Sequence, residues 1–190
     1  HITDYNSLVV LTHFKGHTQG GFGGSNKNIG IGCADGRIGK AWIHTTPGQD
    51  NQWDIKDEEL MERMTESTKS VIDYFGKHIT YVNVMRNMSV SCDCEGIHAA
   101  PVVTPNVGIL SSTDILALDQ ACVDLVYAMT EAEHHDLVER IETRHGLRQL
   151  SYMKELGMGN DRYILIDLDN GGKRITAAEA VKGLKPFVKD

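Results

Sequence analysis

Residue types that mark several common protein classes are scarce in this chain. Of its 190 residues, four are cysteine, four are proline and 6% are aromatic. Four cysteines in an acidic chain without secretion signals are better interpreted as free thiols or metal ligands than as a disulfide framework. The composition, which is 41% hydrophobic, indicates neither disorder nor a fibrous repeat. We therefore expect one soluble globular domain, residues 1–190, with a substantial core.

A dense block of lysine or arginine is also missing, and the net charge is −7. Nucleic-acid binders usually carry a basic stripe, so nucleic acid is not an expected partner. No apolar run approaches the roughly 20 residues that span a bilayer, and the first residues show neither a basic start nor an apolar signal core. We expect a cytoplasmic domain without a membrane partner. Because the chain begins at His1 and soon enters a strand, we also expect a trimmed form or the C-terminal part of a longer protein.

Hydrophobic patterns predict strands and helices that alternate along the chain. Strands are expected at 8–12, 79–85, 107–110 and 162–167, where short apolar or β-branched runs occur. One helix is expected to end at Gly76, and three more are expected at about 114–129, 132–145 and 150–156. A last helix is expected to begin at Thr176. A polar connection is expected at 45–54. The alternation is typical of an α/β fold, and we predict a layered α/β/α sandwich with a mixed or mostly parallel sheet of about four or five strands.

The segment from His13 to Lys40 combines glycines with groups that bind ligands. It directly follows an apolar strand, so its backbone can approach a ligand closely while polar side chains surround it. A Walker loop would need glycine at Ala34 and a hydroxyl residue at Ala41, and the dinucleotide pattern would need glycine at Asn26. Phosphate or nucleotide binding is therefore only an alternative, beside a role of the glycines in tight turns. The residues expected to bind a small molecule are His13, Lys15, His17, Gly23, Gly24, Lys27, Asn28, Lys40 and Asp114.

Histidines and cysteines gather in loops beside strand ends, which is where α/β folds place their sites. Cysteine and histidine offer soft and borderline ligands for zinc, iron or copper, although the spacing here is not that of a zinc finger. We expect a subset of these residues to hold a transition metal, with reactive or structural thiols as the alternative. A shared metal requires two loops to converge: the histidine loop, which begins at His13 and continues to Lys40, and the cysteine loop, which contains Cys92, Cys94 and His98. The candidate ligands are His13, His17, Cys33, His44, Cys92, Cys94 and His98.

Three groups are candidates for acid or base catalysis: Lys15, Lys27 and Asp119. For each lysine the alternative is a solvated loop residue. Asp124 stands five positions after Asp119 and is a further acidic candidate, whereas Asp114 is placed to cap a helix.

Two other features have simple structural interpretations. Cys122 falls on the apolar stripe of a predicted helix and is expected to be a small core residue. The run from Asp167 to Gly172 resembles the start of a calcium loop, but the twelfth position is Ala178 rather than a bidentate carboxylate. We therefore predict a turn there.

Several motifs, taken together and in order, resemble one known family. They are the stretches 12–17, 20–24, 27–33, 39–40, 92–94 and 108–124, which read THFKGH, GGFGG, KNIGIGC, GK, CDC and GILSSTDILALDQACVD. Between about Leu8 and Val126 the chain resembles the domain of unknown function DUF362. The resemblance implies a redox-associated or metal-associated α/β domain whose reaction is unassigned, and it leaves open whether the protein is an enzyme.

Many members of that family are described as iron–sulfur centre proteins, because they contain an inserted ferredoxin-like segment. Between His44 and Asp57 this chain has no cysteine, so a ferredoxin-type [4Fe-4S] cluster is not expected. The N-terminal half of the family pattern is also missing, which implies a site completed by a ferredoxin-like or N-terminal partner region. The competing hypothesis is a non-catalytic scaffold that docks a partner.

Overall fold

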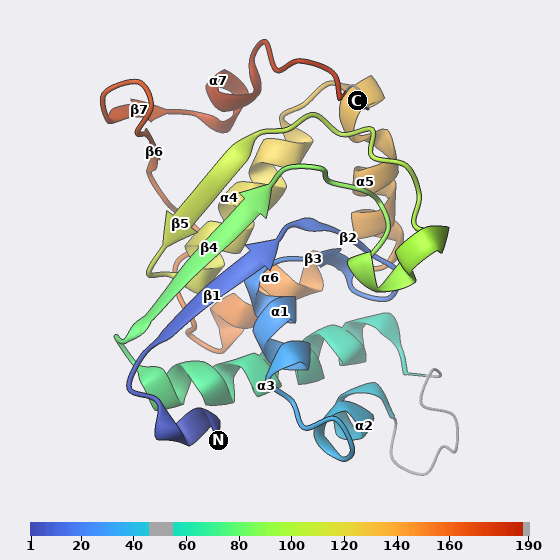
Figure 1. Ribbon diagram of the computed structural model, residues 1–190, viewed down its shortest axis with the longest axis vertical. Coiled ribbons are helices and arrows are strands. Elements are labelled where there is room, and N and C mark those ends of the chain that lie inside the picture. The colour runs from blue at the N-terminus through green and yellow to red at the C-terminus, as the bar shows by residue number, and fades with distance from the viewer. Residues whose placement is uncertain (46–54, 188–190) are drawn as a thin grey trace.

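A mixed three-stranded sheet organises the computed structural model, which describes residues 1–45 and 55–187 (Figure 1). The strands are β1 (Leu8–His13), β4 (Ile79–Met85) and β5 (Gly108–Ser112), in the order β1-β4-β5. β1 runs parallel to β4, with Val10 opposite Tyr81, and β5 runs antiparallel to β4. The predicted α/β class and mixed sheet are confirmed.

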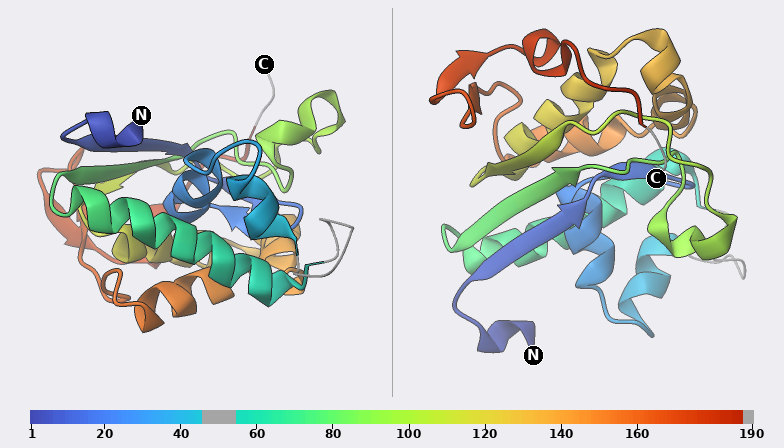
Figure 2. Two further views of the ribbon diagram at one scale, coloured as in Figure 1. Left: turned by 90° about the horizontal axis from the view of Figure 1, so that it is seen from below. Right: turned by 45° about the horizontal axis from the view of Figure 1, so that its top comes forward.

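Helices cover one face of this sheet. Helices α1 (Ser25–Gly32) and α4 (Ile115–Tyr127) pack on the strands, and α3 (Asp57–Phe75) and α6 (Arg148–Glu155) lie behind them. Figure 2 shows these four helices on the same side of the sheet. α1 lies very close to α3, because a Cβ added at Gly30 would stand 2.4 Å from the Met64 carbonyl oxygen.

The opposite face of the sheet is open in the described part of the chain. Alternate residues of β1 point to this face, where Val9 is 69% and Leu11 67% exposed. Ile109 on β5 is 65% exposed. The arrangement therefore differs in detail from the sandwich expected from the sequence: among residues 1–45 and 55–187, the main sheet has three strands and a single helical side.

The predicted helices are confirmed, with small shifts of their ends. α3 ends at Gly76, whose φ of 55° favours glycine. α4 begins after Asp114, whose carboxylate accepts a hydrogen bond from Ala117 N at 2.9 Å, and it places Cys122 in the core as expected. α5 spans Glu131–Thr143, and α6 begins two residues before its predicted start.

Short elements account for the remaining segments. Ile2–Asp4 and Asp93–His98 form the 3-10 helices η1 and η2, β2 (Lys15–His17) pairs with β3 (Gly21–Gly23), and α2 spans Gly39–His44. The predicted strand near 162–167 pairs with β7 (Lys173–Ile175) as β6 (Leu165–Asp167), separate from the main sheet. The turn predicted within 167–172 and the helix start predicted at Thr176 are confirmed: Thr176 and Glu179 form a capping box, and α7 spans Ala177–Val181.

The polar connection expected at 45–54 falls, apart from Thr45, outside the described residues. Among the described helices, none combines the length and the apolar character needed to cross a bilayer.

Candidate metal centre

Two loops far apart in sequence meet beyond the end of β1. The β2–β3 hairpin lies beside the loop that carries η2 (Figure 1), and Gly16 N donates a hydrogen bond to the Ser89 carbonyl oxygen at 2.8 Å. A second contact joins Thr18 Oγ1 to a Glu95 carboxylate oxygen at 2.7 Å. Glycine is required at position 16, because an added Cβ would lie 2.1 Å from the Val90 carbonyl oxygen. The backbone itself therefore brings the histidine loop to the cysteine loop.

This contact assembles a histidine and two cysteines. One ligand atom from each of His17, Cys92 and Cys94 lies within 4.8 Å of the others, and the two Sγ atoms are 2.7 Å apart. Cys92 is 3% exposed, whereas Cys94 reaches the surface. One nitrogen and two sulfur donors can hold zinc or another soft transition metal, and a tetrahedral ion would keep its fourth position open.

Local hydrogen bonds fix the two cysteines at the start of η2. Cys92 precedes the helix, and its Sγ accepts a hydrogen bond from Cys94 N at 3.4 Å. Glu95 accepts from Cys92 N at 2.9 Å and from the Ser91 hydroxyl at 2.8 Å. Burial and the neighbouring Cys92 raise the pKa of the Cys94 thiol, while Lys27 opposes the shift. The thiols are thus held in place before any ligand binds.

The imidazole of His17 is neutral at ordinary pH. Burial, followed by the charges of Lys27 and Lys15, lowers the pKa of His17 to about 3. Neutral imidazole is the form that ligates metals. Gly20 N donates a hydrogen bond to Nδ1 at 2.9 Å, which places the ring proton on Nε2. A metal at Nδ1 would therefore displace the Gly20 amide, and a metal at Nε2 would require the proton to move to Nδ1.

His17 should make stability depend on pH. Its pKa is lowered from 6.5 to about 3 on folding, so the unfolded chain binds a proton that the folded chain rejects as pH falls through this window. The contribution is fully present above about 6.5 and is lost on acidification. We expect His17→Asn, which keeps an acceptor for Gly20 N, to flatten the fall in the free energy of unfolding between pH 7 and pH 4. Urea titrations of the metal-free wild type and variant at several pH values measure the free energy of unfolding. An equal fall of this free energy with pH in both proteins would contradict the lowered pKa of His17.

Lysines and an aspartate surround the three candidate ligands. Lys15 Nζ donates to the His13 carbonyl oxygen at 2.9 Å and pairs with Asp93 at 3.0 Å. The His13 ring bridges Asp93, at 3.0 Å, and the Arg86 carbonyl oxygen, at 2.8 Å. Burial opposes ionisation of Asp93, but Lys15 and His13 hold its pKa below the usual range. Lys15 and His13 are therefore engaged in an ion-pair network at the edge of the site.

Lys27 differs from Lys15 because it forms no direct ion pair with any described residue, although Cys92, Cys94 and Asp93 interact with its charge. Within residues 1–45 and 55–187 its ammonium group makes no hydrogen bond or ion pair. Burial lowers the pKa of Lys27, Cys92 opposes this shift and Lys15 adds to it. A half-buried cation beside two thiols is suited to an anionic ligand or to thiolates.

The remaining metal candidates are not members of the group of His17, Cys92 and Cys94 in the described part of the chain, although the charge of His44 reaches His17 and contributes to lowering its pKa. Cys33 is exposed at the end of α1, and His98 is exposed at the end of η2. The His44 ring lies 2.8 Å from the Lys40 carbonyl oxygen within α2, and the Lys40 side chain is exposed.

Several other candidate residues hold the fold together. The fully buried Asp119 carboxylate accepts hydrogen bonds from Ser25 N, Asn26 N and Asn83 Nδ2 at 2.8, 2.9 and 2.8 Å. It fills the space above Gly24, where an added Cβ would lie 2.6 Å from the carboxylate. The amides at the start of α1, which a phosphate would use, therefore already bind the carboxyl group of Asp119.

Similar structural contacts engage the other polar candidates. Asn28 Nδ2 donates to Thr12 Oγ1 at 2.9 Å, and Gly23 is buried in β3. Asp114 accepts from Asn160 N at 2.9 Å in addition to capping α4. Asp124 accepts from the Tyr163 hydroxyl at 2.7 Å.

Two residues of the site are not among those predicted from the sequence. Asp93 binds both His13 and Lys15, and Gly16 permits the contact between the loops. Their positions in the sequence could have identified them, because Asp93 stands between the two cysteines and Gly16 stands between Lys15 and His17.

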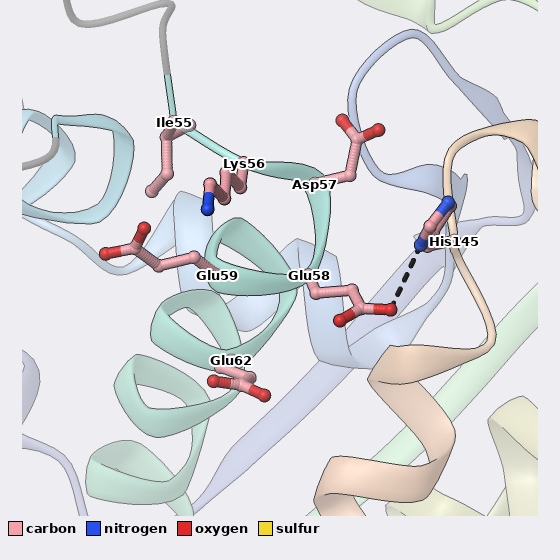
Figure 3. A pocket seen from close by; sticks show the side chains of 7 residues that line it. All are labelled: Ile55, Lys56, Asp57, Glu58, Glu59, Glu62 and His145. Carbon is pink, nitrogen blue, oxygen red and sulfur yellow. Dashed lines mark hydrogen bonds and ion pairs between the residues drawn. The ribbon is translucent and has the colours of Figure 1, made fainter.

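A hollow of about 620 Å³ lies away from this group, at the start of α3 (Figure 3). Three of its four carboxylates face basic side chains: Glu58 lies 3.0 Å from the His145 ring, Glu59 pairs with Arg63 at 2.6 Å and Glu62 with Arg148 at 2.6 Å. None of the candidate ligands lines it; the lining residues are Ile55, Lys56, Asp57, Glu58, Glu59, Glu62 and His145.

Comparison with known protein families shows which family the chain belongs to. The family model described as "Domain of unknown function (DUF362)" matches residues 1–124 of the 190. The chain belongs to the DUF362 family. Searches of curated proteins and of solved structures gave no match. The resemblance seen in the motifs is confirmed, and the DUF362 region contains both converging loops, whereas α5, α6 and the β6–β7 hairpin follow it.

Proposed function

We propose that this DUF362 domain binds a transition metal through His17, Cys92 and Cys94. The observation that supports the proposal is the gathering of their ligand atoms within 4.8 Å. A neutral imidazole and two thiols are ligands that zinc, iron(II) and copper(I) accept. The free thiols suit a reducing compartment, so we place the protein in the cytoplasm.

A fourth ligand would come from a small molecule. Three protein donors leave one position open on a tetrahedral ion. Lys27, whose ammonium group lacks a partner among the described residues, can pair with an anionic group there. We propose a redox-associated or metal-associated domain that binds an anionic small molecule at the metal, with Lys27 as the charge that orients it. A ferredoxin-like or N-terminal partner region would close the exposed side of Cys94.

Metal analysis tests this function. Protein purified without chelators or nickel resin, and then titrated with Co²⁺, is expected to bind one ion and to show thiolate-to-cobalt charge-transfer absorption. His17→Ala, Cys92→Ser and Cys94→Ser each remove one donor and should weaken binding at least about tenfold, in line with losses seen around metal sites. Competition with a chromophoric chelator measures the affinity.

The exposed thiol of Cys33 supplies the matched control. Cys33→Ser should bind Co²⁺ like the wild type, because Cys33 lies outside the group. Wild-type protein that binds no ion, or equal weakening by Cys33→Ser, would refute the metal site.

One observation favours the alternative, a partner-docking scaffold. The open sheet face exposes Val9, Leu11 and Ile109 in the described structure, whereas isolated exposed apolar residues are more usual than a shared face. A metal-free domain whose variants at His17 and Cys92 behave like wild type would support this scaffold role.

A further inference from the structure

The two cysteines of the candidate centre are close enough to react with each other. Their Sγ atoms are 2.7 Å apart, and a disulfide bond needs about 2.05 Å. Both stand at the start of η2, separated by Asp93 alone. We propose that Cys92 and Cys94 form a reversible intramolecular disulfide, so that the pair is a thiol–disulfide exchange site for disulfide-bearing small molecules.

Exposure sets the order of the two sulfurs in the reaction. Cys94 is exposed and can meet an external disulfide, whereas Cys92 is 3% exposed and lies directly behind it. An accessible attacking thiol with a shielded partner is the arrangement that exchange requires. Cys33 is also exposed, but it is not a member of the group that contains the two cysteines.

The exchange needs no metal ion, because the external disulfide is the oxidant. The Cys94 thiolate attacks one sulfur of an oxidant RSSR, forming a mixed disulfide and releasing one RS⁻. The Cys92 thiolate then attacks the Cys94 sulfur, which forms the Cys92–Cys94 bond and releases the second RS⁻. The two thiol protons end on the two RSH products. The protein loses two electrons, and RSSR gains them.

Two contacts of the pair favour these steps, whereas burial and the neighbouring Cys92 oppose them by raising the pKa of the Cys94 thiol. The Lys27 ammonium group attracts negative charge on both sulfurs, and Cys94 N donates to Cys92 Sγ at 3.4 Å. Only one residue separates the cysteines, so the disulfide ring is small and strained, and strained disulfides are readily reduced again. The bond is therefore suited to cycling rather than to permanent stabilisation.

The inference goes beyond the proposed metal function and does not depend on it. Where the metal function holds, oxidation converts two of the three ligands into a disulfide and the ion leaves. Where it fails, the dithiol still exchanges. His17→Ala separates the two cases, because it removes a metal ligand and keeps both sulfurs.

The test uses the reduced, chelator-treated full chain with oxidised glutathione at about pH 9, above the ordinary thiol pKa of about 8.5, because burial raises the pKa of Cys94. After alkylation and mass spectrometry, wild type, Cys33→Ser and His17→Ala are all expected to lose the alkylatable thiols of Cys92 and Cys94, with a disulfide inside the peptide that holds residues 92–94. Any glutathione adduct on the exposed Cys33 is counted separately on its own peptide. In Cys92→Ser, Cys94 should accumulate as a glutathione adduct because nothing resolves it.

Either of two results, measured on the wild-type protein, would overturn the inference. Thiols at 92 and 94 that stay alkylatable while Cys33 forms adducts would show that the pair does not exchange. A persistent glutathione adduct on Cys94 in the wild type would show that Cys92 cannot close the bond. Absence of Co²⁺ binding together with a formed disulfide would instead reject only the metal function.

Discussion

Asp119→Ala is expected to lower the free energy of unfolding by about 3–5 kcal/mol, the range of severe single mutations. The carboxylate accepts hydrogen bonds from Ser25 N, Asn26 N and Asn83 Nδ2, and alanine would leave these buried donors without their acceptor. Burial raises the pKa of Asp119, partly offset by the three hydrogen bonds. Urea unfolding followed by circular dichroism measures the loss.

Two further variants make that prediction specific. Asp119→Asn keeps the volume and one acceptor oxygen, so it should cost less than alanine. Asp73→Ala removes an exposed carboxylate that pairs with Lys69 on α3 and should change stability by no more than about 0.5 kcal/mol. If Asp119→Ala were no more harmful than Asp73→Ala, the buried carboxylate would not be the anchor of α1.

Gly16→Ala should damage both the fold and the candidate centre. The new Cβ would lie 2.1 Å from the Val90 carbonyl oxygen, so the hairpin and the cysteine loop must separate. Overpacking of this kind costs about 1–3 kcal/mol. Because His17 and Cys94 sit on the two sides of this contact, Co²⁺ affinity should also fall at least about tenfold, by analogy with disturbed supporting shells.

Gly36→Ala is the matched control for that variant. An added Cβ at Gly36 meets no atom within 4 Å, so alanine should leave metal affinity unchanged. Equal Co²⁺ affinity of Gly16→Ala and Gly36→Ala would show that the contact at Val90 does not position the ligands.

The sequence was most informative where a single element carries its own pattern. The strand at 79–85 and the helix at 114–129 were predicted closely, because alternation and a three-four apolar spacing are local signals. The region of α1 reads Ser-Asn-Lys-Asn-Ile-Gly-Ile-Gly and lacks such a stripe. Its first amides are bound by Asp119, which stands 94 positions away from Ser25. No local pattern could predict that helix.

The site was predicted only as a set of residue types for the same reason. Seven metal candidates followed from chemistry and loop position, and the structure gathers His17, Cys92 and Cys94. Which histidine meets the cysteines depends on the β2–β3 hairpin, whose strands have three residues each and give almost no periodic signal. The open sheet face was missed because an all-apolar run such as Leu8–Leu11 is typical of a strand buried on both sides.

The parallel pairing of β1 with β4 also determines when the centre can form during folding. His13 and Asp93, which bound the site, stand 80 positions apart, so the chain must close a long loop before either contributes. Contacts of such sequence separation are gained late and slow the search for the native state. A ligand held there acts on a nearly complete fold: it lengthens the lifetime of the native protein by slowing unfolding, and it cannot guide the early steps.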